Sequence, residues 1–445
     1  MKFSKEKIVK SFMLIVIFLS ILCCYSYVIF RLGKGNLRLG VLGKSLVSFA
    51  TFPTTVKQVL LSDEIRGIPP NYVKRDPSFK EMNNLTYNLY GLNSFWNIDL
   101  KRWEVRLFNF KNDAVLHTWH VEKEKLDFSA TNRLFPNAEL RNSLLAKNKS
   151  LITSNDETAN LMKIDANSNV VWRNHEMIFH HSLNFDADSN IWVCTRDLPW
   201  KAIKRSTGVK NLDGRTFSFM ENYITKIDQK TGHILFNKGV SQILIENGYS
   251  GFVYGFSNPK KYPNDPMHLN DIEPVLEDAK YWKKGDVFFS IRHRSLVMLY
   301  RPSTNQVIRL IYGPFINQHD VDIISDEEIS IFNNNYMLEG FEKPEATFEG
   351  GIRSLAASEI LIYNFSDSTF RPHLNSFLEA ERVKTYTQGL HEILSNGDTF
   401  VEAQNFGKLY LLNETGFVMK KEFQTSKKNY VHRPTWIRLY ETLDF

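Results

Sequence analysis

The sequence predicts an all-β protein, a six-bladed β-propeller preceded by one N-terminal transmembrane helix. Three observations indicate this fold. From about Gly91 onward, short segments that alternate apolar and polar residues are separated by turn residues, a pattern typical of strands. A thirteen-residue pattern recurs along the chain, and one long uncharged segment stands near the N-terminus. Self-similar units of short strands are typical of propeller blades or another closed β array.

The uncharged segment predicts a membrane anchor. Residues 11–30, SFMLIVIFLSILCCYSYVIF, follow four lysines and precede Arg31. About 20 apolar residues are enough to cross a bilayer as a helix, and the lysines predict that the N-terminus stays in the cytoplasm. A cleaved signal peptide is the alternative, but the run is longer than a usual signal core and no A-x-A-like site follows it. We therefore expect a single-pass anchor, with the rest of the chain in the periplasm or outside the cell.

The composition limits which kinds of core, partner and cysteine site the chain could have. The 445 residues are 43% hydrophobic and 13% aromatic, which allows a large β-rich core. The net charge of +6 comes without a cluster of basic and aromatic residues, so nucleic acid is not an expected partner. Cys194 is alone outside the apolar segment, which excludes an intrachain disulfide or a cysteine metal site there. We expect three regions: a tip and membrane helix over 1–31, a linker over 32–94, and the propeller over 95–445.

The recurring pattern places particular residues in equivalent positions. HSLNFDADSNIWV from His181 aligns without a gap with HDVDIISDEEISI from His319. Further copies begin at Asn270 and Gly389, and weaker ones begin near Leu144 and Arg102. Each unit reads as three or four short strands. Equivalent positions on the innermost strands of a propeller converge on its central channel, so the first residues of these units are expected to meet there.

Residues on the same face of these strands join the predicted cluster. His268 lies two residues before Asn270 and His391 lies two residues after Gly389, and strand residues two apart share a face. Arg292 in SIRHRS is within reach from the second strand of its unit. A histidine at a strand start, taken alone, is more often a capping or turn residue, but recurrence at one register favours a site. The remaining histidines show no such register, and we interpret them as structural or exposed: His117, His120, His175, His233, His293, His373 and His432.

Two kinds of site fit such a cluster. Neutral imidazoles from several blades suit zinc or iron, but no carboxylate stands at the aligned positions and Arg292 would repel a cation. A guanidinium fork, an amide and neutral histidines instead suit a tetrahedral oxyanion, with one histidine as nucleophile or proton carrier. We therefore predict no metal and no cofactor. The neighbour of His319, Asp320, is expected to point away and to brace the backbone or a neighbouring blade.

The chain resembles a known family at these residues. HHSLNFDADSNIWV, HLNDI, SIRHRS and QHDVDIISDEEISIFNNN are similar to the motifs of the bacterial aryl-sulfate sulfotransferases, six-bladed propellers that move a sulfuryl group between phenols without a nucleotide donor. The resemblance implies that His319 becomes sulfated, that His268, Asn270 and Arg292 hold the sulfuryl oxygens, and that His181 is a general acid or base. Ser182 stands where the family pattern has aspartate.

The resemblance and the repeat together give the predicted site. Catalytic roles are expected for His319, His181, His268 and Arg292, and substrate contacts for Asn270, His180, His391 and Gly389. The expected partners are an aryl sulfate donor, a phenolic or other hydroxyl acceptor, and the membrane. The alternative is a propeller without catalytic activity that binds a glycan or an anionic ligand in the same channel.

Overall fold

The computed structural model describes residues 5–33, 45, 69, 71–122, 139–198, 219–255, 264–336 and 357–443. The chain divides into two compact units, Met1–Ile68 and Pro69–Phe445, and each is described by itself. Of the linker expected over 32–94, residues 34–44, 46–68 and 70 lie outside the described residues.

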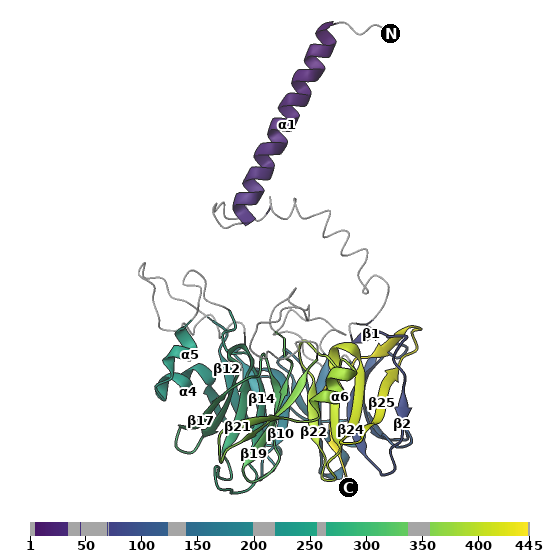
Figure 1. Cartoon of the computed structure of the whole chain (residues 1–445), viewed down its shortest axis with the longest axis vertical. Coiled ribbons are helices and arrows are strands. Elements are labelled where there is room, and N and C mark those ends of the chain that lie inside the picture. Colours follow the sequence, from purple (N-terminus) through teal and green to yellow (C-terminus); the bar gives the residue numbers. More distant parts are fainter. Residues whose placement is uncertain are drawn as a thin grey trace. The chain divides into compact units, whose positions relative to one another are not determined.

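The first unit contains α1 (Lys5–Gly33), the purple helix of Figure 1. Its stretch Phe12–Ile29 has a mean hydropathy of 2.6, and none of it is buried. By length and composition α1 is able to cross a membrane. A signal sequence meets the same criteria, so the helix is consistent with an anchor without fixing its orientation.

The second unit is built from antiparallel sheets (Figure 1). In chain order the first runs β27 (Arg438–Tyr440), β3 (Tyr90–Asn97), β4 (Arg102–Asn109), β5 (Val115–Val121). The second runs β6 (Leu140–Ala146), β7 (Ser150–Asn155), β8 (Leu161–Ile164), β9 (Val170–Asn174). The third runs β10 (Ile178–Phe185), β11 (Ile191–Arg196), β12 (Asn222–Ile227), β13 (Ile234–Gly239).

Three further sheets follow. One runs β14 (Leu269–Pro274), β15 (Val287–Ile291), β16 (Leu296–Arg301), β17 (Gln306–Tyr312). The next runs β18 (His319–Ile323), β19 (Glu328–Asn333), β20 (Glu359–Asn364), β21 (Thr369–Pro372). The last runs β22 (Leu390–Ile393), β23 (Thr399–Ala403), β24 (Lys408–Asn413), β25 (Gly416–Gln424), β26 (Tyr430–His432), β1 (Tyr72–Lys74), with β2 (Met82–Asn83) on β25.

Short helices connect some of the strands. The α-helices are α4 (Val240–Glu246), α5 (Ser250–Tyr254) and α6 (Asn375–Ala380). Single 3₁₀ turns are η2 (Lys147–Lys149), η3 (Arg292–Arg294) and η4 (Gln404–Phe406). The η3 turn directly follows β15 and carries Arg292, so this arginine stands at a strand end rather than within a strand.

Consecutive sheets contact each other through their first strands, in the order β6, β10, β14, β18 and β22. Apolar clusters fill the spaces between neighbouring sheets; one of them joins Phe95 and Phe108 of the first sheet to Leu390 and Phe400 of the last. The two ends of the unit also exchange strands, because β27 pairs with β3 and β1 pairs with β26.

The structure confirms a mostly β chain, with one long apolar helix near the N-terminus among the described residues. The domain boundary expected at residue 95 falls inside β3. The compact unit begins at Pro69, because residues of β1 and β3 pair with strands from the C-terminal end of the chain. Closure into six blades stays a prediction at this point.

Candidate active site

Three of the predicted histidines lie against one another. His181 comes from β10, His319 opens β18, and His268 directly precedes β14. The ring centroid of His181 is 5.2 Å from that of His268 and 6.0 Å from that of His319. His181 and His319 are almost fully buried, whereas 26% of the His268 side chain is exposed. The three histidines therefore converge as the repeat predicted. Solvent reaches this cluster at the His268 side chain.

Irregular backbone at the start of the strands aims these side chains. The pairing register shifts between His180 and Leu183 in β10 and between His319 and Val321 in β18. His181 has a φ of 57° and His268 a φ of 52°, values in the left-handed region that is uncommon outside glycine. A bulge of this kind re-aims a side chain. The simple alternation of faces assumed from the sequence therefore fails at these positions.

The proton on His319 is fixed by its neighbours. Asn334 donates from Nδ2 to the carbonyls of Thr385 and Gln388, at 3.1 and 2.7 Å. Its Oδ1 therefore faces His319 Nδ1, at 2.6 Å, and accepts the proton of that nitrogen. Burial, followed by the charge of Arg292, holds the pKa of His319 well below 6.5. His319 is thus neutral, with its lone pair on Nε2.

That lone pair has a partner of its own. The backbone N–H of Gln388 donates to His319 Nε2 at 3.1 Å. Both ring nitrogens of His319 are therefore satisfied within the protein. Chemistry at Nε2 requires the Gln388 hydrogen bond to be given up.

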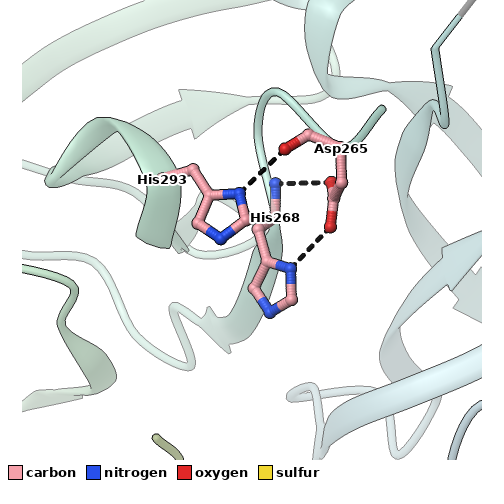
Figure 2. A group of neighbouring side chains, drawn as sticks. All are labelled: Asp265, His268 and His293. Carbon is pink, nitrogen blue, oxygen red and sulfur yellow. Dashed lines mark hydrogen bonds and ion pairs between the residues drawn. The ribbon is translucent and has the colours of Figure 1, made fainter. Parts of the chain in front are cut away.

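Asp265 holds His268 in place (Figure 2). Its carboxylate accepts the backbone N–H of His268 at 3.0 Å and lies 2.6 Å from Nδ1 of the same residue. The second ring nitrogen points away from Asp265 (Figure 2). Burial raises the pKa of Asp265, but the hydrogen bond and charge of His268 outweigh it and hold that pKa below its usual range. The pair thus couples a carboxylate to one ring of the cluster.

His293 completes this corner of the site. Its ring stacks on that of His268 with centroids 4.5 Å apart. Nδ1 donates to the Asp265 carbonyl at 2.8 Å, so Nε2 accepts from Arg292, 3.0 Å away. His293 was expected to be structural or exposed, and it instead links the predicted arginine to the Asp265–His268 pair.

Two buried donors beside the histidines lack a hydrogen-bond partner among the described residues, Arg292 Nε and Trp436 Nε1. The indole of Trp436 lies 6.0 Å from His181 and 6.3 Å from His319, measured between ring centroids. Burial lowers the pKa of Arg292 from 12.5, which leaves a guanidinium charged at neutral pH. Unsatisfied buried donors are rare in proteins, and these two would suit the oxygens of an anion.

The residues expected to contact substrate have different surroundings. Asn270 is fully buried and donates from Nδ2 to the Gln318 carbonyl at 2.7 Å, next to His319. His180 lies behind His181, with 2.7 Å between the two Nδ1 atoms. Burial lowers its pKa to about 4. Gly389 has a φ of 87°, and an added Cβ would stand 2.5 Å from Thr385 and 2.8 Å from Phe332. The positive φ and the lack of room for a Cβ explain why glycine stands at position 389.

His391 is bound elsewhere. Asp320 accepts both the backbone N–H of His391, at 2.7 Å, and its Nδ1–H, at 2.9 Å. The ring of His391 stacks on Phe332, with centroids 6.2 Å apart. The structure therefore does not bring His391 to the three histidines. It confirms that Asp320 braces a neighbouring strand, because β18 and β22 belong to consecutive sheets.

The brace made by Asp320 recurs between other sheets. Asp271 accepts the N–H of Val321 at 2.8 Å, and Ser182 accepts the N–H of Ile272 at 3.0 Å. In each case a side chain on the first strand of one sheet accepts a backbone N–H from the first strand of the following sheet. Ser182, which replaces the aspartate of the family pattern, therefore keeps the same hydrogen bond with a shorter, uncharged acceptor.

Within the described part of the chain, two groups hold histidine and carboxylate atoms close enough for a metal ion, namely Asp265, His268 and His293, and Asp320, Asp322 and His391. In the first group the facing atoms are already paired with each other, and a guanidinium lies 3.0 Å from His293. In the second, Nδ1 of His391 is the donor to Asp320. Neither arrangement favours a cation over the hydrogen bonds already made.

Asp265, His293, Asn334 and Trp436 were not predicted from the sequence. They stand outside the thirteen aligned positions, so the repeat carries no information on them. The motif SIRHRS contained part of the signal, because His293 adjoins Arg292 in it. Asp265 lies three residues before His268 and binds it locally, whereas Trp436 reaches the site only through contacts between distant parts of the chain.

Comparisons with known proteins give the following. A protein of unknown function from Bacteroides caccae has 11% sequence identity and a TM-score of 0.47, over 79% of this chain and 98% of that one. Virginiamycin B lyase from Staphylococcus aureus has 9% identity and a TM-score of 0.35, over 65% and 71%. A streptogramin B lyase has 7% identity and a TM-score of 0.40, over 83% and 97%. No curated protein matches the chain in sequence.

The family comparison is more decisive. The profile of the family described as Arylsulfotransferase (ASST) matches residues 142–424. This range is well over half of the chain and includes β10, β14, β18 and every histidine of the cluster. Family membership supports an aryl sulfotransferase type of function in general. The chain belongs to the arylsulfotransferase (ASST) family.

Proposed function

We propose that the protein moves a sulfuryl group from an aryl sulfate to a phenolic or other hydroxyl acceptor through a sulfated His319. The observation that carries this proposal is the convergence of His181, His268 and His319 beside Arg292. The unpartnered donors Arg292 Nε and Trp436 Nε1 support it. Positioned donors stabilise the charge that spreads over the oxygens of the transferred group, and such stabilisation is usually the largest part of catalysis.

The reaction divides into two displacements. The lone pair of neutral His319 Nε2 attacks the sulfur of the donor, the S–O bond to the aryl group breaks, and the phenol oxygen leaves with the electron pair. An acceptor hydroxyl then attacks the sulfur and gives its proton to a histidine of the cluster, while the N–S bond breaks and the bonding electrons return to Nε2. Arg292 and Asn270 are the proposed ligands of the sulfuryl oxygens. A covalent intermediate of this kind predicts ping-pong kinetics.

The first step places one demand on the chain. The Gln388 N–H lies on the lone pair of His319, so the donor has to displace it. Asn334 keeps Nδ1 protonated through the whole cycle and thereby keeps the lone pair on Nε2. The displaced N–H would then be free to donate to an oxygen of the transferred group.

The architecture and the location are part of the proposal. We propose that the six sheets close into a six-bladed propeller, and that α1 anchors it as a single-pass helix with its N-terminus in the cytoplasm. The strand exchange of β27 and β1 between the two chain ends supports closure, because such pairing leaves few open edges. The four lysines before the apolar segment support the orientation.

A labelling experiment tests the proposed reaction. The full chain in detergent is incubated with 4-nitrophenyl sulfate without an acceptor, and its peptides are analysed by mass spectrometry. One SO₃ group on the peptide that contains His319 is the expected result, with none in His319→Ala. His233→Ala is the matched control, because His233 is exposed and lies outside the cluster. Wild type that carries no SO₃ and releases no nitrophenol would refute the proposal.

Binding without catalysis is the second candidate function. The observation in its favour is the Gln388 hydrogen bond, which satisfies the nucleophile of the proposed reaction. On this reading an anionic ligand sits beside Arg292 and is not cleaved. Saturable binding of an aryl sulfate without turnover, abolished by Arg292→Ala, would favour this alternative.

A further inference from the structure

Only one of the three converging rings is hydrogen bonded to a carboxylate among the described residues. His268 Nδ1 lies 2.6 Å from Asp265 Oδ2. The ring of His181 meets His180 instead, and that of His319 meets Asn334 and the Gln388 N–H. A proton placed on His268 therefore faces a negative partner, while a proton on either of the other two rings has none.

We propose that Asp265 is a positioning residue that makes His268 the proton donor to the departing phenol oxygen, an inference that rests on the proposed function. This gives His268 the acid and base role that the family resemblance had assigned to His181. It also gives the Asp265–His268 pair a chemical purpose beyond holding the backbone before β14.

The electrostatics of the cluster agree with this assignment. Burial, followed by the neighbouring histidines, holds the pKa of His181 well below 6.5, and burial does the same for His319. Both rings are therefore neutral at pH 7 and poor sources of a proton. The titratable and charged groups that face His268 are Asp265 and His293, Arg292 beyond His293, and His180, His181 and His319 from the adjoining strands.

The proposed step balances as follows. His319 Nε2 forms a bond to sulfur while the S–O bond to the aryl group breaks, and the oxygen takes the bonding electrons. The oxygen then receives the Nε2 proton of the His268 imidazolium, which leaves a neutral ring whose Nδ1–H still donates to Asp265. In the second half, the acceptor hydroxyl returns a proton to His268 Nε2 as its oxygen attacks sulfur. No oxidant, metal or further reactant is needed.

His293 keeps the pair aligned. It stacks on the His268 ring and donates to the Asp265 carbonyl, so it holds both members at once. Its Nε2 accepts from Arg292, which ties the sulfuryl-binding cation to the proton donor. Asn222 Nδ2 donates to the other Asp265 oxygen at 3.0 Å. The carboxylate therefore accepts from Asn222 and twice from His268, while His293 holds the backbone carbonyl of the same residue.

Leaving-group dependence tests the proposal. Phenyl sulfate releases a basic phenolate that needs a proton, whereas 4-nitrophenyl sulfate releases a stable anion that does not. In Asp265→Asn we expect kcat/KM to fall by about 10²-fold for phenyl sulfate and by less than about 5-fold for 4-nitrophenyl sulfate. Asp188→Asn is the matched control, since that side chain is 67% exposed and lies in the turn between β10 and β11. Equal losses for the two donors would overturn the proposal.

A companion variant guards against misfolding. His268→Gln leaves Asp265 and its bond to Asn222 in place, and we expect the same selective loss for phenyl sulfate. The double variant Asp265→Asn/His268→Gln should lose no more than His268→Gln alone, because Asp265 acts through the histidine. Additive losses in the double variant would mean that Asp265 contributes independently, which contradicts the assignment.

A second readout does not depend on turnover. In full-length protein labelled with ¹⁵N-histidine, the signal lost in His268→Gln identifies the ring, and its titration midpoint is measured. Asp265→Asn should lower that midpoint by at least about one pH unit, and an unchanged midpoint would overturn the pairing. A wild type that titrates as expected but transfers no sulfuryl group would refute the proposed function alone.

Discussion

Among the described residues, two histidine rings are hydrogen bonded to a carboxylate, and these two pairs differ in almost everything except that hydrogen bond. Asp265 lies 2.6 Å from Nδ1 of His268, and Asp320 lies 2.9 Å from Nδ1 of His391. The His268 side chain is 26% exposed and touches two further histidines, whereas the His391 side chain is fully buried against Phe332.

The surroundings separate the two pairs by function. Asp320 also accepts the backbone N–H of His391, so its carboxylate joins one sheet to the next. The Asp265 carboxylate is hydrogen bonded to a ring whose other nitrogen points away from it (Figure 2), and 26% of that side chain is exposed. A histidine–aspartate contact is therefore no evidence of chemistry until the free ring nitrogen is located.

The largest expected difference between the pairs is kinetic. His268→Gln should reduce transfer from phenyl sulfate by about 10²–10³-fold, because the departing oxygen loses its proton donor. The melting temperature should change little, since the ring is partly exposed. Steady-state kinetics and thermal unfolding on the same preparation check both statements. A variant that keeps its activity would place the proton donor elsewhere.

Substitution in the Asp320–His391 pair should change the stability of the fold. Asp320→Ala leaves the backbone and ring donors of His391 buried without an acceptor, which costs about 2–3 kcal/mol in free energy of unfolding. Activity of the folded fraction should persist, because His391 does not reach the cluster. Denaturant unfolding and kcat/KM measured together test this expectation, and a catalytic loss at unchanged stability would contradict it.

The carboxylate beside Asp320 should make stability depend on pH. Burial, followed by the charge of Asp320, raises the pKa of Asp271 to about 7, against 3.8 for an ordinary aspartate. Its neutral form therefore contributes stability that is complete below pH 3.8 and is lost as pH rises through 7. Asp271→Asn stays neutral and keeps an acceptor for Val321, so its stability at pH 8 should exceed that of wild type by roughly 1–3 kcal/mol.

Buried histidines change the stability in the opposite direction with pH, and they provide an internal control for the effect of Asp271. The pKa of His180 is lowered by burial to about 4, so the unfolded chain binds its proton first and stability falls as pH drops from 6.5 toward 4. Asp271→Asn should leave this acidic limb unchanged. Loss of the acidic limb, or an alkaline limb equal to that of wild type, would show that Asp271 is not the titrating group.

The smallest expected effect concerns Ser182. Ser182→Ala removes the acceptor for the Ile272 N–H between two sheets, at a cost of about 1 kcal/mol. Its hydroxyl, unlike Asp320, holds no histidine ring, so the loss should be smaller than for Asp320→Ala. Chemical denaturation of the two variants side by side measures the difference, and a larger loss for Ser182→Ala would reverse the ranking.

The sequence predicted the strands and the contact between His181 and His319, because residues at the same position of a repeated unit occupy equivalent places in the fold. It also predicted the brace by Asp320. The placement of His391 failed, because β10 and β18 shift register beside their histidines whereas β22 pairs regularly with β23, so the aligned positions are not equivalent. Strand alternation holds only while the register is unbroken.

The residues that contact the histidines could not be predicted from the sequence, for a different reason. Asn334 meets His319 through the bend after β19, and Trp436 comes from the segment before the C-terminal strand β27. Such contacts depend on how sheets pack, which no local pattern encodes. Asp265 stands only three residues before His268, but nothing in that spacing separates a functional pair from an ordinary turn.

The central claim is that His319 Nε2 carries the sulfuryl group, and a pre-steady-state burst tests it most directly. Wild type is mixed rapidly with 4-nitrophenyl sulfate in the absence of acceptor, and nitrophenolate release is followed in time. We predict a burst equal to one nitrophenolate per active chain, followed by a slow phase that added phenol accelerates, and no burst in His319→Ala. A burst of the same size in His319→Ala, or turnover without a burst and without ping-pong kinetics, would contradict the account.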